Sequence, residues 1–171
     1  YQSWKDAGHI GYWWSFMPVK KDTEPFPSEG FVIKTRNDAS VDLTKPEAYF
    51  YAKYAIAAGA DKLTLKARNF NGSSPTYFGL VAITEDMAVT PVIPTFTPGE
   101  GVENYLGEAV NGQLFKFINE DGGQGNPEKY ATFEYDLSAF DGKNVVLALG
   151  VVKGEDSGNE DKLCMYSITL N

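Results

Sequence analysis

The sequence is poor in the residues on which much metal, disulfide and nucleophilic chemistry depends. Its 171 residues include one cysteine, Cys164, and one histidine, His9. A single cysteine excludes a disulfide within the chain, and so small a supply of ligands nearly excludes a zinc site. Neither residue lies in a nucleophile motif, and no G-x-S-x-G occurs. Cys164 falls inside an expected strand, where a free thiol usually packs as a small apolar side chain.

Positive charge is also scarce. Fifteen lysine and arginine residues stand against 23 aspartate and glutamate residues, which gives a net charge of −8. Nucleic acids and anionic membrane surfaces are bound through a basic footprint, so this composition argues against both partners. Residues 86–171 hold fourteen of the acidic residues and only five basic ones. Acidic residues in such a segment usually lie on a solvated surface, and the more specific alternative is a cation site in an acidic loop.

Long apolar segments, repeats and helical periodicity are missing. The longest apolar run, Val145–Val152, is far shorter than the ~20 residues that cross a bilayer. The chain starts at Tyr1 without a basic segment followed by an apolar one, so we expect a processed form or an excised fragment. No repeat of solenoid or propeller length occurs. The length predicts a single domain spanning residues 1–171.

Alternation of apolar and polar residues is the dominant pattern that is present. In Lys62–Arg68, the residues Leu63, Leu65 and Ala67 share one face, which predicts a half-buried strand. Thr76–Thr84 and Val145–Val152 are apolar on both faces, as in central strands. Further strands are expected at Ile10–Met17, Gly30–Arg36, Ala48–Ala57, Val92–Thr97, Gln113–Ile118, Thr132–Leu137 and Lys162–Leu170.

Glycine and proline lie mostly between these runs. Residues 58–61 and 140–143 predict tight hairpin connections, and Val102–Ala109 is compatible with one or two turns of helix. The long connections Pro98–Gly112, Asn119–Lys129 and Gly154–Asp161 are acidic loops, and loops on a β scaffold often carry function. So many short strands predict an all-β sandwich or barrel. A jelly roll fits best, because the strands are long and the connections uneven.

The C-terminal part of the chain carries a family resemblance. Asp136–Lys143 (DLSAFDGK) leads into the apolar run VVLALG, and the segment starting at Asp161 forms a final strand. This resembles the closing strands of galactose-binding-like jelly-roll domains, in which a "DLS-aromatic-x-GK" hairpin precedes a long apolar strand. In this pattern Asp136 and Ser138 cap the turn, Gly142 supplies a positive φ, and Lys143 stays solvated. Residues 1–45 match no part of the family.

The resemblance implies a setting and a role. Galactose-binding-like domains occur as accessory modules of secreted bacterial proteins, including glycan-degrading enzymes and cleaved-adhesin-type surface proteins. We therefore expect an extracytoplasmic, secreted or cell-surface module of a larger protein. Many such domains place an acidic residue just before the isoleucine of the final strand, as a ligand to a structural calcium. Here Tyr166 and Ser167 precede Ile168, so the resemblance does not carry the calcium over.

Aromatic side chains supply candidates for sugar binding, because sugars stack their apolar C–H faces on flat rings. Trp4, Tyr12, Trp13 and Trp14 form the first group. On a regular strand at most one of Trp13 and Trp14 points outward, and the alternative is that these rings seal one end of the core. Tyr49 and Tyr51 share a strand face and are either a second platform or cross-strand packing partners.

Polar candidates lie at strand ends and in the acidic loops. Arg36, Arg68 and Asn69 are placed where they could read sugar hydroxyls. Calcium prefers several carboxylate and carbonyl oxygens, which makes two loop groups candidate ligands, although neither matches the D-x-[DN]-x-[DN]-G pattern and such loops are often simply solvated. These groups are Glu120, Asp121 and Glu128, and Asp156, Asn159 and Asp161.

Three functions therefore remain open from the sequence. The first is non-catalytic carbohydrate binding with no required cofactor and calcium as an option. The second is a structural or protein-binding surface domain, which an exposed strand edge or apolar patch would favour. The third is a small jelly-roll glycosidase or lyase, which needs two facing carboxylates in a cleft. The sequence favours the first, because it combines the resemblance with a large supply of aromatic residues.

Overall fold

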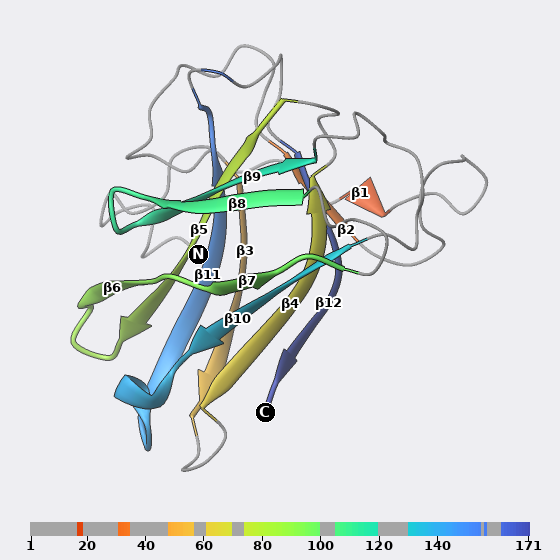
Figure 1. Cartoon of the computed structure of the whole chain (residues 1–171). Helices are drawn as coiled ribbons and strands as arrows, with labels where there is room; N and C mark the ends of the chain where they lie inside the picture. The colour runs from red at the N-terminus through yellow and green to blue at the C-terminus, as the bar shows by residue number, and fades with distance from the viewer. Residues whose placement is uncertain are drawn as a thin grey trace.

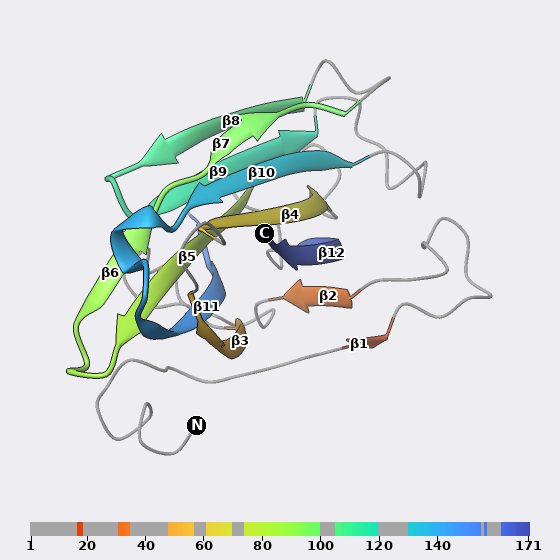
Figure 2. The same cartoon turned by 90° about the horizontal axis from the view of Figure 1, so that it is seen from below.

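The fold is an antiparallel β-sandwich (Figure 1). A computed structural model describes residues 17–18, 31–34, 48–56, 61–69, 74–99, 105–119, 130–154, 156 and 162–171. Sheet A has the strand order β1 (Met17–Pro18), β2 (Phe31–Lys34), β12 (Lys162–Leu170), β4 (Lys62–Asn69), β10 (Ala131–Asp136) and β7 (Thr95–Thr97). Figure 2, seen from below, shows this order from β1 across to β10.

Sheet B packs face to face against sheet A. Its strand order is β3 (Ala48–Ala55), β11 (Asn144–Val152), β5 (Thr76–Thr84), β9 (Leu114–Asn119) and β8 (Tyr105–Val110), and β6 (Val89–Val92) also pairs with β5. All pairs between the described strands are antiparallel. The predicted all-β sandwich is confirmed, and the jelly-roll connectivity stays a prediction. No helix in the described part of the chain is long and apolar enough to cross a membrane.

The core lies between the sheets, and alternation builds it. Leu63, Leu65 and Ala67 of β4 are buried as predicted, as are Phe133 and Tyr135 of β10. Apolar side chains that alternate along a strand all reach the same face, so each sheet contributes one apolar layer. β5 and β11 each have a paired strand on both sides, which confirms their prediction as central strands.

The predicted hairpins at residues 58–61 and 140–143 are wrong, because both segments connect the two sheets. β3 lies in sheet B and β4 in sheet A, while β10 lies in sheet A and β11 in sheet B. Since β3 pairs with β11 and β4 with β10, one long antiparallel ribbon bends from one sheet to the other. At the bend, the Ile56 N–H donates to Lys143 O at 2.9 Å and the Gly142 N–H to Ile56 O at 2.8 Å.

The bend itself has the local geometry expected from its sequence. The Ser138 N–H donates to Asp136 Oδ1 at 2.9 Å at the start of a short 3-10 helix, η1 (Ser138–Phe140). The hydroxyl and the amide of Ser138 hold the pKa of Asp136 below its ordinary value. Gly142 has φ +72°, as predicted, and Lys143 is exposed. The turn chemistry was therefore readable from the sequence, although its role as a crossover was not.

Two further expectations need correction around β6 to β9. The predicted strand Val92–Thr97 is two strands, since β6 ends at Val92 in sheet B and β7 begins at Thr95 in sheet A. The helical turn expected at Val102–Ala109, inside the expected loop 98–112, is wrong for residues 105–109, which belong to strand β8. β8 and β9 form a hairpin closed by a bond from the Gln113 N–H to Val110 O at 3.1 Å.

The remaining strand predictions agree with the structure within a few residues at each end. They correspond to β2, β3, β4, β5, β9, β10, β11 and β12. Of the expected strand Ile10–Met17, only Met17 lies in the described part, where it belongs to β1.

Candidate functional site

Most of the sequence-predicted site residues lie outside the described part of the chain. These are Trp4, Tyr12, Trp13, Trp14, Arg36, Glu120, Asp121, Glu128, Asn159 and Asp161. Their proposed roles in sugar or calcium binding stay predictions.

Tyr49 and Tyr51 lie in the edge strand β3. The register places Tyr49 opposite Gly150 and Tyr51 opposite Ala148 in β11. This register is all that the structure describes of the two residues. Their use as a sugar platform or as cross-strand packing partners stays a prediction.

Arg68 and Asn69 do not lie where they could form hydrogen bonds with the hydroxyls of a bound sugar. They are 1% and 0% exposed. The Asn69 amide donates to Phe117 O at 2.9 Å and to Ser74 O at 2.6 Å, and Asn69 Oδ1 accepts a bond from the Thr76 hydroxyl at 3.0 Å. Asn69 therefore ties the end of β4 to β9 and β5, and the sequence-based role is corrected to a structural one.

Asp156 is the one calcium candidate within the described residues, and its carboxylate is engaged by two side chains. Oδ1 accepts the Tyr77 hydroxyl at 2.5 Å, and Oδ2 pairs with Lys116 Nζ at 2.6 Å. Partial burial acts to raise the pKa of Asp156, but the bonds from Lys116 and Tyr77 hold it below its ordinary value. The described residues contain no group of three or more His, Cys, Asp or Glu side chains that could hold a metal ion. Asp156 is thus bonded to β5 through Tyr77 and to β9 through Lys116.

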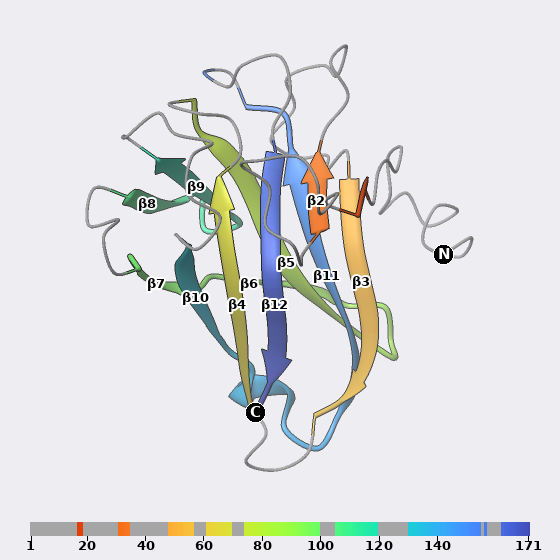
Figure 3. The ribbon, with the colours of Figure 1, turned by 90° about the vertical axis from the view of Figure 1, so that its right-hand side faces the viewer.

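The face of sheet A that is turned away from the core carries polar, partly or fully exposed side chains from Lys62 to Lys66, whereas Arg68 and Cys164 on the same face are buried. Figure 3 shows the strands of this sheet, with β12 and β4 side by side. We call this face the outer face of sheet A. Across its strands the register aligns small hydroxyl side chains with Lys66: Ser167 in β12, Thr132 in β10 and Thr97 in β7. Lower on the same face, Lys62 Nζ pairs with Glu134 Oε1 at 2.5 Å. The face therefore offers many donors and acceptors to a flat polar ligand.

Two aromatic rings meet on this face, at the end of the sheet where β10 begins. Tyr130 directly precedes β10, and Tyr166 lies in β12, where the register shifts between Met165 and Ser167. The ring centroids are 5.1 Å apart with the planes tilted by 43°, and both residues are partly exposed. Lys66 Nζ lies 5.1 Å from the centroid of the Tyr130 ring. We call Tyr130 and Tyr166 the tyrosine pair.

Sequence reasoning missed the tyrosine pair. Tyr130 falls on the polar side of the alternation Tyr130-Ala131-Thr132-Phe133, which was a usable signal for an outward-facing ring. Tyr166 gave no such signal, because the bulge in β12 changes the alternation at that point. That the two rings meet follows from the pairing of β12 and β10 with opposite sides of β4, which local patterns do not contain.

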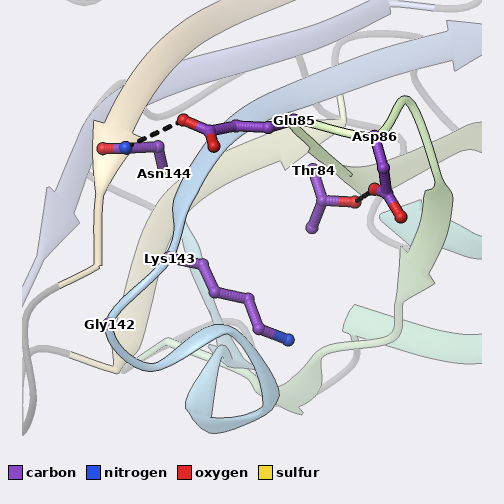
Figure 4. A pocket seen from close by; sticks show the side chains of 6 residues that line it. All are labelled: Thr84, Glu85, Asp86, Gly142, Lys143 and Asn144. Carbon is purple, nitrogen blue, oxygen red and sulfur yellow. Dashed lines mark hydrogen bonds between the residues drawn. The ribbon is translucent and has the colours of Figure 1, made fainter.

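A pocket of about 430 Å³ lies at the other end of the sandwich, between the β5–β6 turn and the start of β11 (Figure 4). Its lining residues are Thr84, Glu85, Asp86, Gly142, Lys143 and Asn144, none of which is aromatic. Asn144 Nδ2 donates to Glu85 Oε1 at 3.0 Å across the pocket.

The other polar groups of the pocket bond within their own loops. Asp86 Oδ1 accepts from the Thr84 hydroxyl, and Lys143 Nζ donates to Ala139 O at 3.1 Å. The bond from Thr84 and the Ala88 amide lower the pKa of Asp86. The volume suits a small ligand, but the pocket lacks a ring on which a sugar could stack. The tyrosine pair is therefore the better candidate for carbohydrate.

No protein-family model matches the chain, and no curated protein matches it.

Proposed function

We propose that this chain is a non-catalytic carbohydrate-binding module of a secreted or cell-surface bacterial protein. The observation that supports the proposal best is the tyrosine pair on the outer face of sheet A, surrounded by hydroxyl side chains. The bacterial, extracytoplasmic setting rests on the resemblance of Asp136–Lys143 and the following strand to galactose-binding-like domains.

The proposed mechanism uses stacking for affinity and hydroxyls for orientation. A sugar ring places its C–H face on Tyr130 or Tyr166. Ser167 and Thr132, which flank Lys66 in the register, then exchange hydrogen bonds with the sugar hydroxyls. Because the exposed residues Ser167 and Thr169 continue along β12 from the pair, the site suits an internal segment of a long glycan chain. No cofactor is required, and calcium remains an option through the acidic loops.

Binding is tested by calorimetric titration of the protein against soluble oligosaccharides of several classes, in calcium and in EDTA. We expect saturable binding to one class, and a loss of about tenfold or more in affinity for Tyr130→Ala, because aromatic stacking is worth on the order of 1 kcal/mol or more. Thr169→Ala, on the same face below the pair, is the control and should bind nearly as the parent does.

Two outcomes contradict this assignment. Absence of binding to every class removes the carbohydrate proposal itself. If Tyr130→Ala and Tyr166→Ala bind normally while Tyr49→Ala or Tyr51→Ala does not, carbohydrate binding stands and the site moves to β3.

A protein-binding role is the second candidate, and strand β8 favours it. β8 lies at the end of sheet B, and among the described strands it pairs only with β9. Residues 106–109 are exposed, with Leu106 at 48%. An unpaired strand edge can accept an added strand from a partner. If glycan binding fails in the titration above, this edge becomes the better-supported site.

A further inference from the structure

We infer that the glycan bound at the tyrosine pair is anionic, with a carboxylate on the sugar that stacks there. The inference rests on the proposed carbohydrate function and specifies its ligand class. It comes from three features that the described residues show around Tyr130 and Tyr166: an ammonium with no carboxylate beside it, a hydroxyl without an acceptor, and no acidic side chain next to the rings.

The ammonium belongs to Lys66. Within the described residues its interaction is with the Tyr130 ring, at 5.1 Å, and no carboxylate lies within ion-pair distance of it. Two other strand lysines differ, since Lys62 pairs with Glu134 and Lys116 pairs with Asp156. Among the described residues, Lys66 is therefore a local positive charge beside the aromatic pair, in a chain of net charge −8. Such a site favours an anion.

The hydroxyl belongs to Tyr166. Its oxygen is buried and has no hydrogen-bond partner within the described part of the chain. Burial raises the pKa of this phenol, while the nearby Arg68 guanidinium acts in the opposite direction. The hydroxyl therefore keeps its proton and can act as a donor. The oxygen is covered, so a ligand reaches it by shifting neighbouring side chains, and the bond that it then accepts offsets the cost of a buried donor without an acceptor.

The position of Lys66 decides between neutral and anionic sugars. A sugar that stacks on Tyr130 competes with Lys66 for the ring face and breaks the cation–π contact. A neutral sugar offers the displaced ammonium a hydroxyl acceptor without charge. A carboxylate adds the attraction of an opposite charge to the hydrogen bond, and the flexible lysine stem lets the ammonium follow it.

The register shows what surrounds the site. Lys66 has Ser167 on one side and Thr132 on the other, and Thr97 follows in β7. Two acidic side chains of β10 share this face among the described residues: Glu134, one row lower, pairs with Lys62, and Asp136 lies two rows lower, opposite Lys62. A carboxylate next to Lys66 therefore meets donors and no like charge among the described residues.

The test compares matched acidic and neutral oligosaccharides of the same length and linkage: oligogalacturonate with oligogalactose, and oligoglucuronate with oligoglucose. We expect about tenfold tighter binding of the acidic partner in one pair, with an advantage that falls as salt rises. Lys66→Met removes the charge and keeps the length, so it should abolish the acidic preference while neutral binding persists. Tyr166→Phe should lower the acidic preference and leave stacking intact.

Lys62→Met is the matched control, because it makes the same change on the same strand and face at a lysine already paired with Glu134. It should leave the acidic preference unchanged. Equal losses in Lys66→Met and Lys62→Met would overturn the site, since they indicate general charge attraction. Tighter binding of the neutral partner that depends on Tyr130 would overturn the inference and leave the carbohydrate function standing. Failure of all four probes and of the wider panel above would remove both.

Discussion

Three tyrosines show how differently one side chain is used within this fold. The Tyr77 hydroxyl donates to Asp156, and the Tyr166 hydroxyl, beside the Tyr130 ring, has no acceptor among the described residues. The Tyr135 hydroxyl lies in the core, where the residue is 1% exposed, and has no partner among the described residues. Burial raises the pKa of Tyr135 far above its ordinary value, so the group is neutral. A buried donor without an acceptor costs free energy that a phenylalanine would avoid.

Tyr135→Phe is therefore expected to raise the free energy of unfolding by about 1 kcal/mol, because it removes an unsatisfied buried hydroxyl and keeps the ring. Tyr77→Phe makes the same change where the hydroxyl is bonded to Asp156, and it should lower the free energy of unfolding. Urea denaturation of the two variants beside the parent measures both. A loss of stability in Tyr135→Phe as large as that in Tyr77→Phe would mean that the Tyr135 hydroxyl has a partner.

Predictions about single residues were confirmed where the hydrogen bond or backbone angle depends on residues next to them in the sequence. The bond from Ser138 to Asp136 and the positive φ of Gly142 follow from a few adjacent residues, and both are present. Arg68 shows the opposite case. Alternation placed it on the outer face of β4, but its burial depends on packing with residues such as Cys164 and Tyr166, far along the chain. Local patterns do not contain that information.

At the scale of elements, the β8–β9 hairpin is the feature that the sequence offered and pattern reading missed. Asn111 and Gly112 have φ of +53° and +64°, as in the turn that joins two strands directly. Asn-Gly is a strong signal for that turn. Gly107 weakened the strand pattern of β8, yet the structure explains it: an added Cβ there would lie 2.4 Å from the Phe115 ring.

Gly112→Ala tests the turn. A Cβ at Gly112 meets no atom within 4 Å, so any loss of stability comes from the backbone conformation alone. The cost of a non-glycine residue at positive φ predicts about 1–2 kcal/mol. Gln113→Ala, the next residue and also exposed, should change stability by less than about 0.5 kcal/mol. Thermal unfolding followed by circular dichroism compares them, and equal effects would show that the left-handed turn is not what holds the hairpin.

The bend of the long ribbon marks the limit of element prediction. β3, β4, β10 and β11 were all predicted within a few residues, but the partner sheet of each was not. The sequence of a tight connection shows the same turn residues whether its two strands pair with each other or enter opposite sheets. The difference arises because β3 pairs with β11 and β4 with β10, residues that lie far apart in sequence. The tyrosine pair was missed for the same reason.

At the scale of the whole molecule, one group of phenylalanines joins the two sheets. Phe133 of sheet A has its ring centroid 5.1 Å from that of Phe78, 5.6 Å from that of Phe115 and 5.2 Å from that of Phe117, all in sheet B. Phe96 of β7 lies 5.4 Å from Phe133. Edge-to-face and tilted contacts of this kind are favourable beyond the area that they bury. The sheets are therefore expected to unfold together.

Phe133→Ala removes the ring at the centre of this group. We expect it to lower the free energy of unfolding by about 3–5 kcal/mol, a large part of the 5–15 kcal/mol typical of a domain. Because both sheets lose contacts, the far-ultraviolet and near-ultraviolet circular dichroism signals should shift together to lower urea, in one transition. Leu106→Ala, at an exposed site on β8, is the control and should shift neither signal measurably. Two separated transitions in Phe133→Ala would show instead that each sheet holds a core of its own.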